Sequence, residues 1–263
     1  KAGDKVKVTT QEDAFEGILM PNEETNSIII KLESGYNIGI DEKKVKEIVL
    51  IEKFIANEEK ENVAIEKDPK KPTIAILHTG GTIASKVDYR TGGITPRFSP
   101  EDIIGMFPEL KSIANITSKL IANMFSEDMR FIHYTIMAKA IAEEVKNDVD
   151  GIILTHGTDT MGYSAAALAF ALEGINIPVI LVGSQRSSDR GSSDAASNLL
   201  AAAHFITKTD FVGVAVCMHE NTNDDICAIL PACKTRKLHT SRRDAFKPVN
   251  DIPVAHVDYQ AGT

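Results

Sequence analysis

Two short stretches of the chain combine threonine with glycine in a way that suits nucleophilic catalysis. In the first, "HTGGT" at residues 78–82, an apolar run stops at two threonines around a Gly-Gly pair. A threonine hydroxyl is a weak nucleophile that needs a positioned proton acceptor, and the N–H groups of Gly80 and Gly81 could stabilise an oxyanion. Thr82 is therefore a candidate nucleophile, and a glycine turn with a capping threonine is the alternative.

The second stretch, "THGTDT" at residues 155–160, sets a hydroxyl beside a carboxylate. Thr158 supplies the hydroxyl, and Asp159 could bind a substrate ammonium group or orient a base. The alternative is a simple N-cap, because threonine and aspartate commonly precede helices. Both stretches share one plan: an apolar strand, then His and Thr near a glycine, then a threonine where a helix or turn begins.

Two further stretches add chemistry. The segment "FSEDM", residues 125–129, places Ser126, Glu127 and Asp128 after an apolar strand, and "RKLHTSRRDAF", residues 236–246, contributes Lys237 among several cations. A lysine near threonines in a dry cleft could lose its proton and serve as a base. The alternative for Lys237 is an ordinary solvated surface lysine.

Alternating strands and helices must position these residues. From residue 73 onward, apolar strands are separated by amphipathic or alanine-rich segments, which predicts a parallel sheet covered on both faces. The expected strands are residues 73–82, 116–128 (running into a loop), 151–160, 178–186 and 211–218, and the expected helices are residues 99–110, 133–147, 161–173 and 192–206. In such sheets ligands bind beyond the carboxyl ends of the strands, which is where the hydroxyl-bearing residues fall.

The first 52 residues have a different character. Short alternating or β-branched runs predict four or five strands, which indicates a small β-barrel or curled sheet. Residues 53–72 are highly charged and contain Pro69 and Pro72, which is typical of a linker. The sequence thus predicts an α/β protein with a small β-barrel domain (1–52), a charged linker (53–72) and a parallel-sheet α/β domain (73–263).

Composition narrows the possible functions. The formal net charge of −8 argues against a chain that coats nucleic acid by itself, although a basic partner remains compatible. No apolar run is long enough to span a bilayer, so no membrane association is expected. Three cysteines form an odd and sparse set, which favours a reducing compartment and hence a cytoplasmic location.

Several other features have an ordinary structural interpretation. Cys217, His219, Cys227 and Cys233 lack the paired close spacings that zinc prefers, so no metal site is predicted. His156 is expected to make a structural hydrogen bond rather than transfer protons. The cations of residues 234–247 could touch RNA or a partner, but a solvated, salt-bridged face is the simpler expectation.

Taken together, the four stretches resemble the bacterial-type asparaginase and glutaminase family. The matching motifs are "TGGTIA", "THGTDTM", "VGSQR" and "KLHTSRRDAF", and the resemblance covers residues 73 to about 253. It implies hydrolysis of a small amino-acid amide through a covalent acyl-threonine. Thr82 matches the primary nucleophile and Tyr89 the flexible-loop tyrosine that polarises it. Thr158, Asp159 and Lys237 match the second catalytic set, while Tyr89, Ser126, Asp128 and Asp159 are implied to contact the substrate.

The N-terminal β domain and the stretch "SQRSSDRGSSDAASNLL" narrow the resemblance to the family of D-type subunits of archaeal glutamyl-tRNA(Gln) amidotransferases. This resemblance implies that glutamine is hydrolysed here without a cofactor. The ammonia would pass to a partner, the E-type subunit, which uses ATP and Mg²⁺ and supplies most of the tRNA(Gln) contacts. A homodimeric core is also implied. The alternatives are a free-standing L-asparaginase and a non-catalytic assembly module, and the joint presence of the four catalytic candidates speaks against the latter.

Two departures from the family pattern are expected to matter. Glu127 stands where free-standing asparaginases usually have an amide residue, and its carboxylate would repel a substrate carboxylate. The chain also stops at "DYQAGT", and we expect the family's C-terminal domain to be missing from it.

Overall fold

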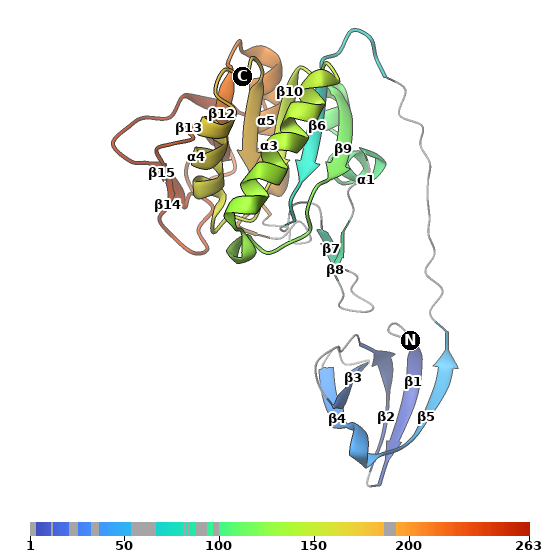
Figure 1. The fold of residues 1–263 in the computed structure, drawn as a ribbon. Helices are drawn as coiled ribbons and strands as arrows, with labels where there is room; N and C mark the ends of the chain where they lie inside the picture. Colours follow the sequence, from blue (N-terminus) through green and yellow to red (C-terminus); the bar gives the residue numbers. More distant parts are fainter. Residues whose placement is uncertain are drawn as a thin grey trace. The chain divides into compact units, whose positions relative to one another are not determined.

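A computed structural model describes most of the chain (Figure 1). The described residues are 4–11, 13–20, 26–32, 37–53, 67–80, 83, 85–87, 94–96, 100–186 and 193–263. They fall into two compact units, one comprising Lys1–Glu61 and Lys86–Thr95 and the other Asn62–Ser85 and Pro96–Thr263.

The N-terminal unit contains an antiparallel sheet of short strands. Its elements are β1 (Lys5–Thr10), β2 (Ala14–Leu19), β3 (Ser27–Leu32), β4 (Asn37–Asp41), the 3₁₀ helix η1 (Glu42–Lys44) and β5 (Val45–Glu52). The strand order is β4-β3-β2-β1-β5. Its core is small, with Val6, Val8, Ile30 and Ile40 as the buried cluster. The small N-terminal β domain expected from the sequence is thus confirmed as a five-stranded antiparallel sheet.

The second unit is built on a seven-stranded sheet in the order β16-β13-β12-β11-β10-β6-β9. The strands are β6 (Thr73–His78), β9 (Asn115–Leu120), β10 (Gly151–Thr155), β11 (Pro178–Val182), β12 (Gly213–His219), β13 (Ile226–Pro231) and β16 (Ala255–Asp258). Strands β9, β6, β10, β11 and β12 run parallel, as predicted. Strand β13 is antiparallel to both β12 and β16, and the sequence reasoning did not anticipate these two strands.

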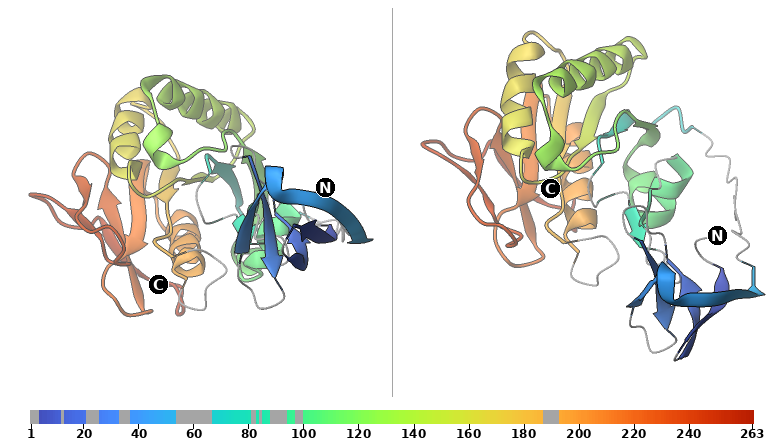
Figure 2. Two further views of the ribbon diagram at one scale, coloured as in Figure 1. Left: turned by 90° about the horizontal axis from the view of Figure 1, so that it is seen from below. Right: turned by 60° about the horizontal axis from the view of Figure 1, so that its bottom comes forward.

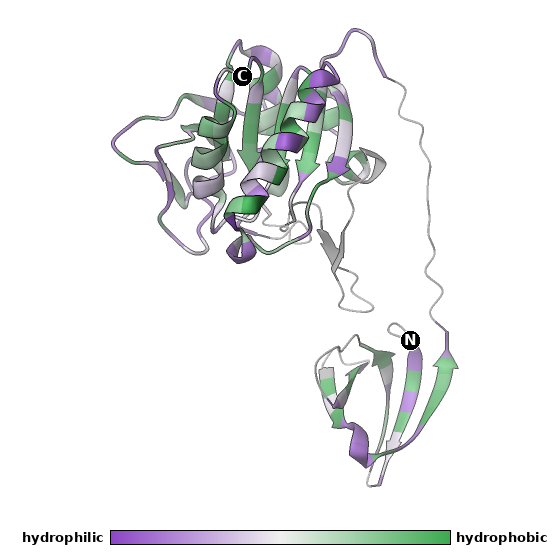
Figure 3. Ribbon diagram, in the orientation of Figure 1, coloured by the Kyte–Doolittle hydropathy of each residue, from purple (hydrophilic) through white to green (hydrophobic). Residues whose placement is uncertain are grey.

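Helices cover both faces of this sheet (Figures 1 and 2). Helices α3 (Phe131–Lys146) and α4 (Met161–Ala171) contribute to the buried cluster on one face, and α1 (Pro100–Met106), α2 (Leu110–Ile113) and α5 (Ala195–Lys208) contribute to that on the other. Along β10, Ile152 and Leu154 pack in the cluster of α3 and α4, and Ile153 packs in the cluster of α1, α2 and α5. Both faces of the strands are therefore apolar, which is why the strands form continuous apolar runs in the sequence (Figure 3).

One crossover in the sheet has an unusual hand. The connections β9–α3–β10 and β10–α4–β11 advance along the sheet on one face, and β6–α1–α2–β9 runs in the opposite direction on the other face, which gives all three the same hand. The connection β11–α5–β12 advances along the sheet in the same direction as β10–α4–β11, but its helix lies on the opposite face. Because parallel crossovers are right-handed in about 98% of cases, we assign the first three as right-handed and β11–α5–β12 as left-handed.

Short elements complete the unit. They are the 3₁₀ helix η2 (Ser126–Asp128) and the hairpin of β14 (Thr235–Lys237) with β15 (Phe246–Pro248). The paired strands β7 (Ser85–Val87) and β8 (Ile94–Pro96) fall mostly within Lys86–Thr95, the second segment of the N-terminal unit. Helix α3 starts two residues earlier than predicted because the backbone N–H of Arg130 donates to His133 Nδ1 (2.9 Å) and closes its first turn. Within the described ranges, no helix is long and apolar enough to cross a membrane.

Candidate active site

A lysine joins the two residues that the "THGTDT" stretch singled out. Lys237 Nζ donates to Thr158 Oγ1 (2.7 Å) and to Asp159 Oδ1 (2.7 Å). Thr158 and Asp159 follow the carboxyl end of β10, whereas Lys237 ends β14, in a distant part of the chain. The Lys237 side chain is 13% exposed and that of Asp159 64% exposed, so the cluster is sheltered on the lysine side and open at the carboxylate.

The 3₁₀ turn η2 brings Ser126 to the same carboxylate. Ser126 Oγ donates to Asp159 Oδ2 (3.2 Å), and Thr160 Oγ1 holds the turn by donating to the carbonyl of Ser126 (2.8 Å). Asp128 lies exposed on this turn, as does Glu127, whose carboxylate is 3.4 Å from Ser126 Oγ. The hydroxyl and carboxylate candidates from two separate stretches therefore meet at one point.

Neighbouring charges set the protonation of Asp159. Its pKa is lowered, first by the hydrogen bond from Lys237 and further by the charge of that lysine and the Ser126 hydroxyl, while partial burial opposes the shift. Asp159 therefore stays a carboxylate well into acidic solution, and it presents a negative charge to any substrate cation.

The first threonine stretch is only partly described. Thr79 is buried, and its hydroxyl donates to the carbonyl of Thr155 (2.9 Å), which ties the end of β6 to that of β10. Gly80 has φ 111°, and a Cβ there would lie 2.4 Å from the Met124 carbonyl oxygen, so the turn requires glycine. Thr82 and Tyr89 lie outside the described residues, and their roles stay predictions.

Two buried histidines lie behind these strand ends, and the sequence analysis missed the role of one. His78 is in hydrogen-bond contact with Thr155 Oγ1 (2.9 Å) and Ser118 Oγ (2.9 Å), so it links β10, β6 and β9. Burial lowers its pKa to about 4, which keeps the ring neutral. The position of His78, one residue before Thr79 at the end of an apolar strand, was the only available signal.

His156 makes the structural hydrogen bonds expected of it. Its Nδ1 donates to the carbonyl of Gly157 (2.7 Å), and Ser164 Oγ lies 2.8 Å from its Nε2. Burial lowers the pKa of His156, which favours the neutral ring. This histidine therefore supports the turn that carries Thr158.

The segment around Lys237 is anchored by its cations. The Arg236 guanidinium lies 5.3 Å from the centroid of the Tyr163 ring on α4. Arg242 forms a bidentate ion pair with Asp244 (2.8 and 2.9 Å), and Arg243 forms an ion pair with Asp224. The salt-bridged face expected for residues 234–247 is thus present around these arginines.

The cysteine and histidine cluster does not form a metal site in the part of the chain that the structure describes. No group of three or more His, Cys, Asp or Glu side chains there is placed to hold a metal ion. Cys217, Cys227 and Cys233 are all free thiols. Cys217 and His219 on β12 and Cys227 on the adjacent β13 are all buried, and each is in hydrogen-bond contact with Asn198 of α5.

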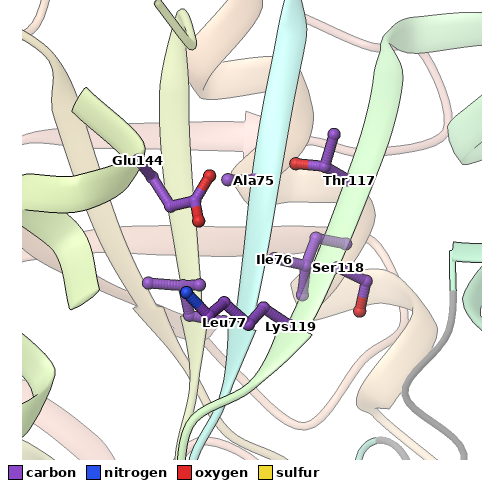
Figure 4. A pocket seen from close by; sticks show the side chains of 7 residues that line it. All are labelled: Ala75, Ile76, Leu77, Thr117, Ser118, Lys119 and Glu144. Carbon is purple, nitrogen blue, oxygen red and sulfur yellow. The ribbon is translucent and has the colours of Figure 1, made fainter. Parts of the chain in front are cut away.

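A separate cavity of about 170 Å³ lies against β6 and β9 (Figure 4). It is lined by strand residues such as Thr117 and Lys119 and by Glu144 of α3. None of the candidate site residues that the structure describes lines it, so it is distinct from the Thr158–Lys237 cluster.

The α/β unit that carries this cluster has a clear match among protein families. Residues 73–262 match the family model described as "Asparaginase, N-terminal". The chain therefore belongs to the asparaginase family. Solved structures agree: the thermostable L-asparaginase from Thermococcus kodakarensis shares 29% sequence identity at a TM-score of 0.61, covering 71% of this chain and 54% of that protein. A probable cytoplasmic L-asparaginase from Campylobacter jejuni shares 31% identity at a TM-score of 0.56, covering 68% and 52%.

The N-terminal unit makes the assignment more specific. Residues 1–51 match the GatD N-terminal domain. The chain is similar to proteins named as the D-type subunit of glutamyl-tRNA(Gln) amidotransferase: 47% identical over 259 residues in Methanococcus maripaludis, covering 97% of this chain and 61% of the relative, and 47% identical over 266 residues in Pyrococcus furiosus, covering 98% and 60%. The resemblance to these archaeal D-type subunits is thus confirmed, and the chain spans about three fifths of the length of these relatives.

Proposed function

We propose that the protein is the glutaminase subunit of a tRNA-dependent amidotransferase, which releases ammonia for the conversion of Glu-tRNA(Gln) to Gln-tRNA(Gln). The observation that carries this proposal is the contact of one lysine amine with both the Thr158 hydroxyl and the Asp159 carboxylate. The names of the relatives and the GatD N-terminal match support the choice of this amidotransferase over other amidohydrolases.

The proposed reaction runs through an acyl-threonine. A threonine hydroxyl, with Thr82 as the predicted primary nucleophile, attacks the side-chain amide carbon of glutamine and forms a C–O bond. The C–N bond then breaks, and the hydroxyl proton leaves with the nitrogen as ammonia. Water hydrolyses the ester, releases glutamate and restores the threonine. Lys237, Thr158 and Asp159 form the proton-transfer set for these steps.

Asp159 has a double role in this proposal. Its carboxylate accepts hydrogen bonds from Lys237 and Ser126, yet the side chain is largely exposed and can receive a substrate ammonium group. An arriving ammonium competes with Lys237 for this carboxylate, so the lysine amine is left with the Thr158 hydroxyl as its partner in proton transfer. Ser126 and Asp128 complete the proposed substrate contacts.

The remaining assignments follow from the same proposal. The E-type subunit would hold ATP and Mg²⁺, activate the glutamyl group and supply most of the tRNA(Gln) contacts, with a homodimer of the present chain at the core. Three unpaired cysteines suit a cytoplasmic setting. The proposed domains are residues 1–52, a linker at 53–72 and residues 73–263, which the family matches at 1–51 and 73–262 support.

A free-standing L-asparaginase is the second candidate function. It is favoured by the likeness of the α/β unit to solved L-asparaginases. In that case Glu127, exposed beside Ser126, would lie next to the bound amino acid and affect which substrate is accepted.

Ammonia release by the full-length protein separates these candidates. It should be measured with glutamine and with asparagine, by the protein alone and with the E-type subunit, ATP and Glu-tRNA(Gln), and repeated with Thr82→Ala. Glutamine turnover that depends on the partner and tRNA, and is lost in the variant, is expected. Rapid asparagine hydrolysis by the protein alone would favour the asparaginase. No turnover under any condition would favour a non-catalytic module.

A further inference from the structure

A buried carboxylate holds the turn that follows β11. Asp194, fully buried at the start of α5, accepts hydrogen bonds from the Ser184 hydroxyl (2.9 Å) and from the backbone N–H groups of Gln185 (3.0 Å) and Arg186 (2.9 Å). The side-chain amide of Asn198 donates a fourth (3.1 Å). A buried charge is tolerated when it is fully hydrogen-bonded, and the adjacent N-terminus of α5 stabilises it further.

This turn lies directly behind Thr158. The backbone of Gly183 packs so closely that a Cβ there would lie 2.8 Å from the Thr158 methyl carbon and 3.2 Å from the His156 carbonyl oxygen. Only glycine allows this approach, and a shift of the turn by a fraction of an ångström would move the Thr158 side chain.

The same turn also reaches the segment that follows Lys237. Gln185 Nε2 donates to the Arg242 carbonyl oxygen (2.9 Å), which also accepts from the backbone N–H of Ala245 (3.2 Å). Leu238 in turn bonds through its N–H to the carbonyl of Ala245 (2.7 Å). The turn after β11 is therefore connected to Thr158 on one side and to the hairpin of Lys237 on the other.

The left-handed crossover explains why this turn needs a strong anchor. After β11 the chain turns to the face of α5 instead of the face of α4, which is the rare choice for parallel strands. Asp194 holds the start of the turn and the start of α5 together, with Asn198 also donating to the carbonyl of Gly183 (3.0 Å). The Asp194 carboxylate thus fixes the turn at which the chain passes from β11 to the face of the sheet that carries α5.

We propose that Asp194 and Gln185 are positioning residues that set the distance between the Thr158 hydroxyl and the Lys237 amine. The proposal rests on the proposed amidohydrolase function, because it assigns these two groups to proton transfer. Asp194 fixes the turn, the turn supports Thr158 through Gly183, and Gln185 ties the Lys237 hairpin to it. Neither residue touches the substrate.

Two variants of the full-length protein test this. Asp194→Asn keeps the shape of the side chain but turns an N–H group toward the N–H of Gln185, which releases the turn. Gln185→Ala removes only the bond to Arg242. Asp258→Asn is the matched control, since Asp258 Oδ1 likewise accepts two backbone N–H groups, from Gln260 (3.0 Å) and Ala261 (2.9 Å), in a turn that contains no candidate residue.

Two readouts are needed. Glutamine-dependent ammonia release gives kcat and KM, and competitive acetylation by acetic anhydride, read by mass spectrometry, gives the labelling rate of each lysine. We expect kcat to fall about 100-fold in Asp194→Asn and about 10-fold in Gln185→Ala, with KM within about twofold. Lys237 should be labelled several-fold faster in both, while the exposed Lys139 and Lys146 of α3, and every lysine of Asp258→Asn, keep wild-type rates.

The outcomes separate this proposal from the proposed function. Wild-type kcat and wild-type Lys237 labelling in folded Gln185→Ala would overturn the positioning role. If Asp194→Asn does not fold, Gln185→Ala alone is the decisive variant. If wild-type protein releases no ammonia from any amide, the proposed function fails. Faster Lys237 labelling in the two variants would then still support the positioning role, and unchanged labelling would overturn it.

Discussion

The two units of the molecule bury different kinds of side chains. Among the described residues, the N-terminal sheet buries a cluster of four aliphatic side chains and has Asp4 as its buried polar residue. The seven-stranded unit has two large apolar layers and buries polar side chains such as His78, Thr155, Ser184 and Asp194 near the carboxyl ends of its strands. Buried polar networks hold side chains in fixed geometry when fully satisfied, so the second unit has the properties that an active site requires.

The exposed side chains of β5 in the N-terminal unit support the same distinction. Four consecutive residues of β5, Ile48 to Ile51, are 43–54% exposed, although each is aliphatic. An exposed apolar edge strand is an aggregation hazard in a lone domain, and it suits contact with another surface better than chemistry. The comparison teaches that the larger unit holds the buried polar side chains and the candidate site, while the smaller unit has a small core and an exposed apolar edge strand.

The largest effect on stability is expected from Leu154→Ala, near the carboxyl end of β10. Leu154 is fully buried between the sheet and helices α3 and α4. Dense packing on all sides leaves a cavity that cannot collapse, so we expect a loss of about 4 kcal/mol in the free energy of unfolding. Urea unfolding followed by near-UV circular dichroism would measure it. A loss below about 1 kcal/mol would show that this layer is not tightly packed.

A pH dependence should appear in the same unit because of its buried histidines. The pKa of His78 is lowered from 6.5 to about 4, so the unfolded chain binds its proton first. The stability that the neutral His78 contributes is fully present above pH 6.5 and is lost as the pH falls toward 4. This loss lowers the free energy of unfolding by about 3 kcal/mol. His156 acts with the same sign. In His78→Gln, urea unfolding at several pH values should show a shallower dependence, and an unchanged slope would argue against a neutral buried His78.

Ile30→Ala is the matched substitution in the N-terminal sheet. Ile30 is as fully buried as Leu154, but among the described residues its cluster has three other buried members, so it can relax around the gap. We expect a loss of about 2 kcal/mol, confined to the amides of residues 5–52 in hydrogen exchange, with glutamine turnover by the protein unchanged. Faster exchange throughout the seven-stranded sheet would mean that the two units do not unfold independently.

The smallest effect is expected from Leu50→Lys on β5. Leu50 is 54% exposed, so the isolated protein should lose less than about 0.5 kcal/mol in the free energy of unfolding. Its tendency to aggregate should fall, which light scattering would show. Binding to the proposed E-type subunit should weaken if β5 contributes to that surface, and a stability loss above about 2 kcal/mol would mean that β5 is packed rather than exposed.

Much of the scaffold was predictable because the strands of the larger unit are buried on both faces. Their uninterrupted apolar runs and the helices between them predicted that β6, β10, β11 and β12 lie in a parallel sheet. Strands β13 and β16 were missed because the expected alternation of strands and helices ends at β12, whereas β13 pairs antiparallel with β12 and β16 with β13 without an intervening helix. The left-handed crossover could not be predicted from the sequence either, because hand is a property of how three elements pack.

The candidate site was predictable only in part. Thr158 and Asp159 were found because they follow a clear strand, and Lys237 because of the family resemblance, since it comes from a distant hairpin. The structure brings these three together with Ser126. Asp194 and His78 were not recognised, because a buried aspartate at a helix start and a histidine at a strand end have many ordinary explanations. Only the convergence of distant segments distinguishes them.

The central claim is that Lys237 transfers protons at the Thr158–Asp159 cluster of a glutamine-hydrolysing enzyme. The most direct test compares kcat for ammonia release from glutamine in Lys237→Met and in the control Lys234→Met, an exposed lysine three residues earlier, using the full-length protein with its partner and Glu-tRNA(Gln). Our account predicts a loss of about 100- to 10,000-fold in Lys237→Met and wild-type activity in the control. Equal activity of the two variants, with wild-type protein active, would contradict it.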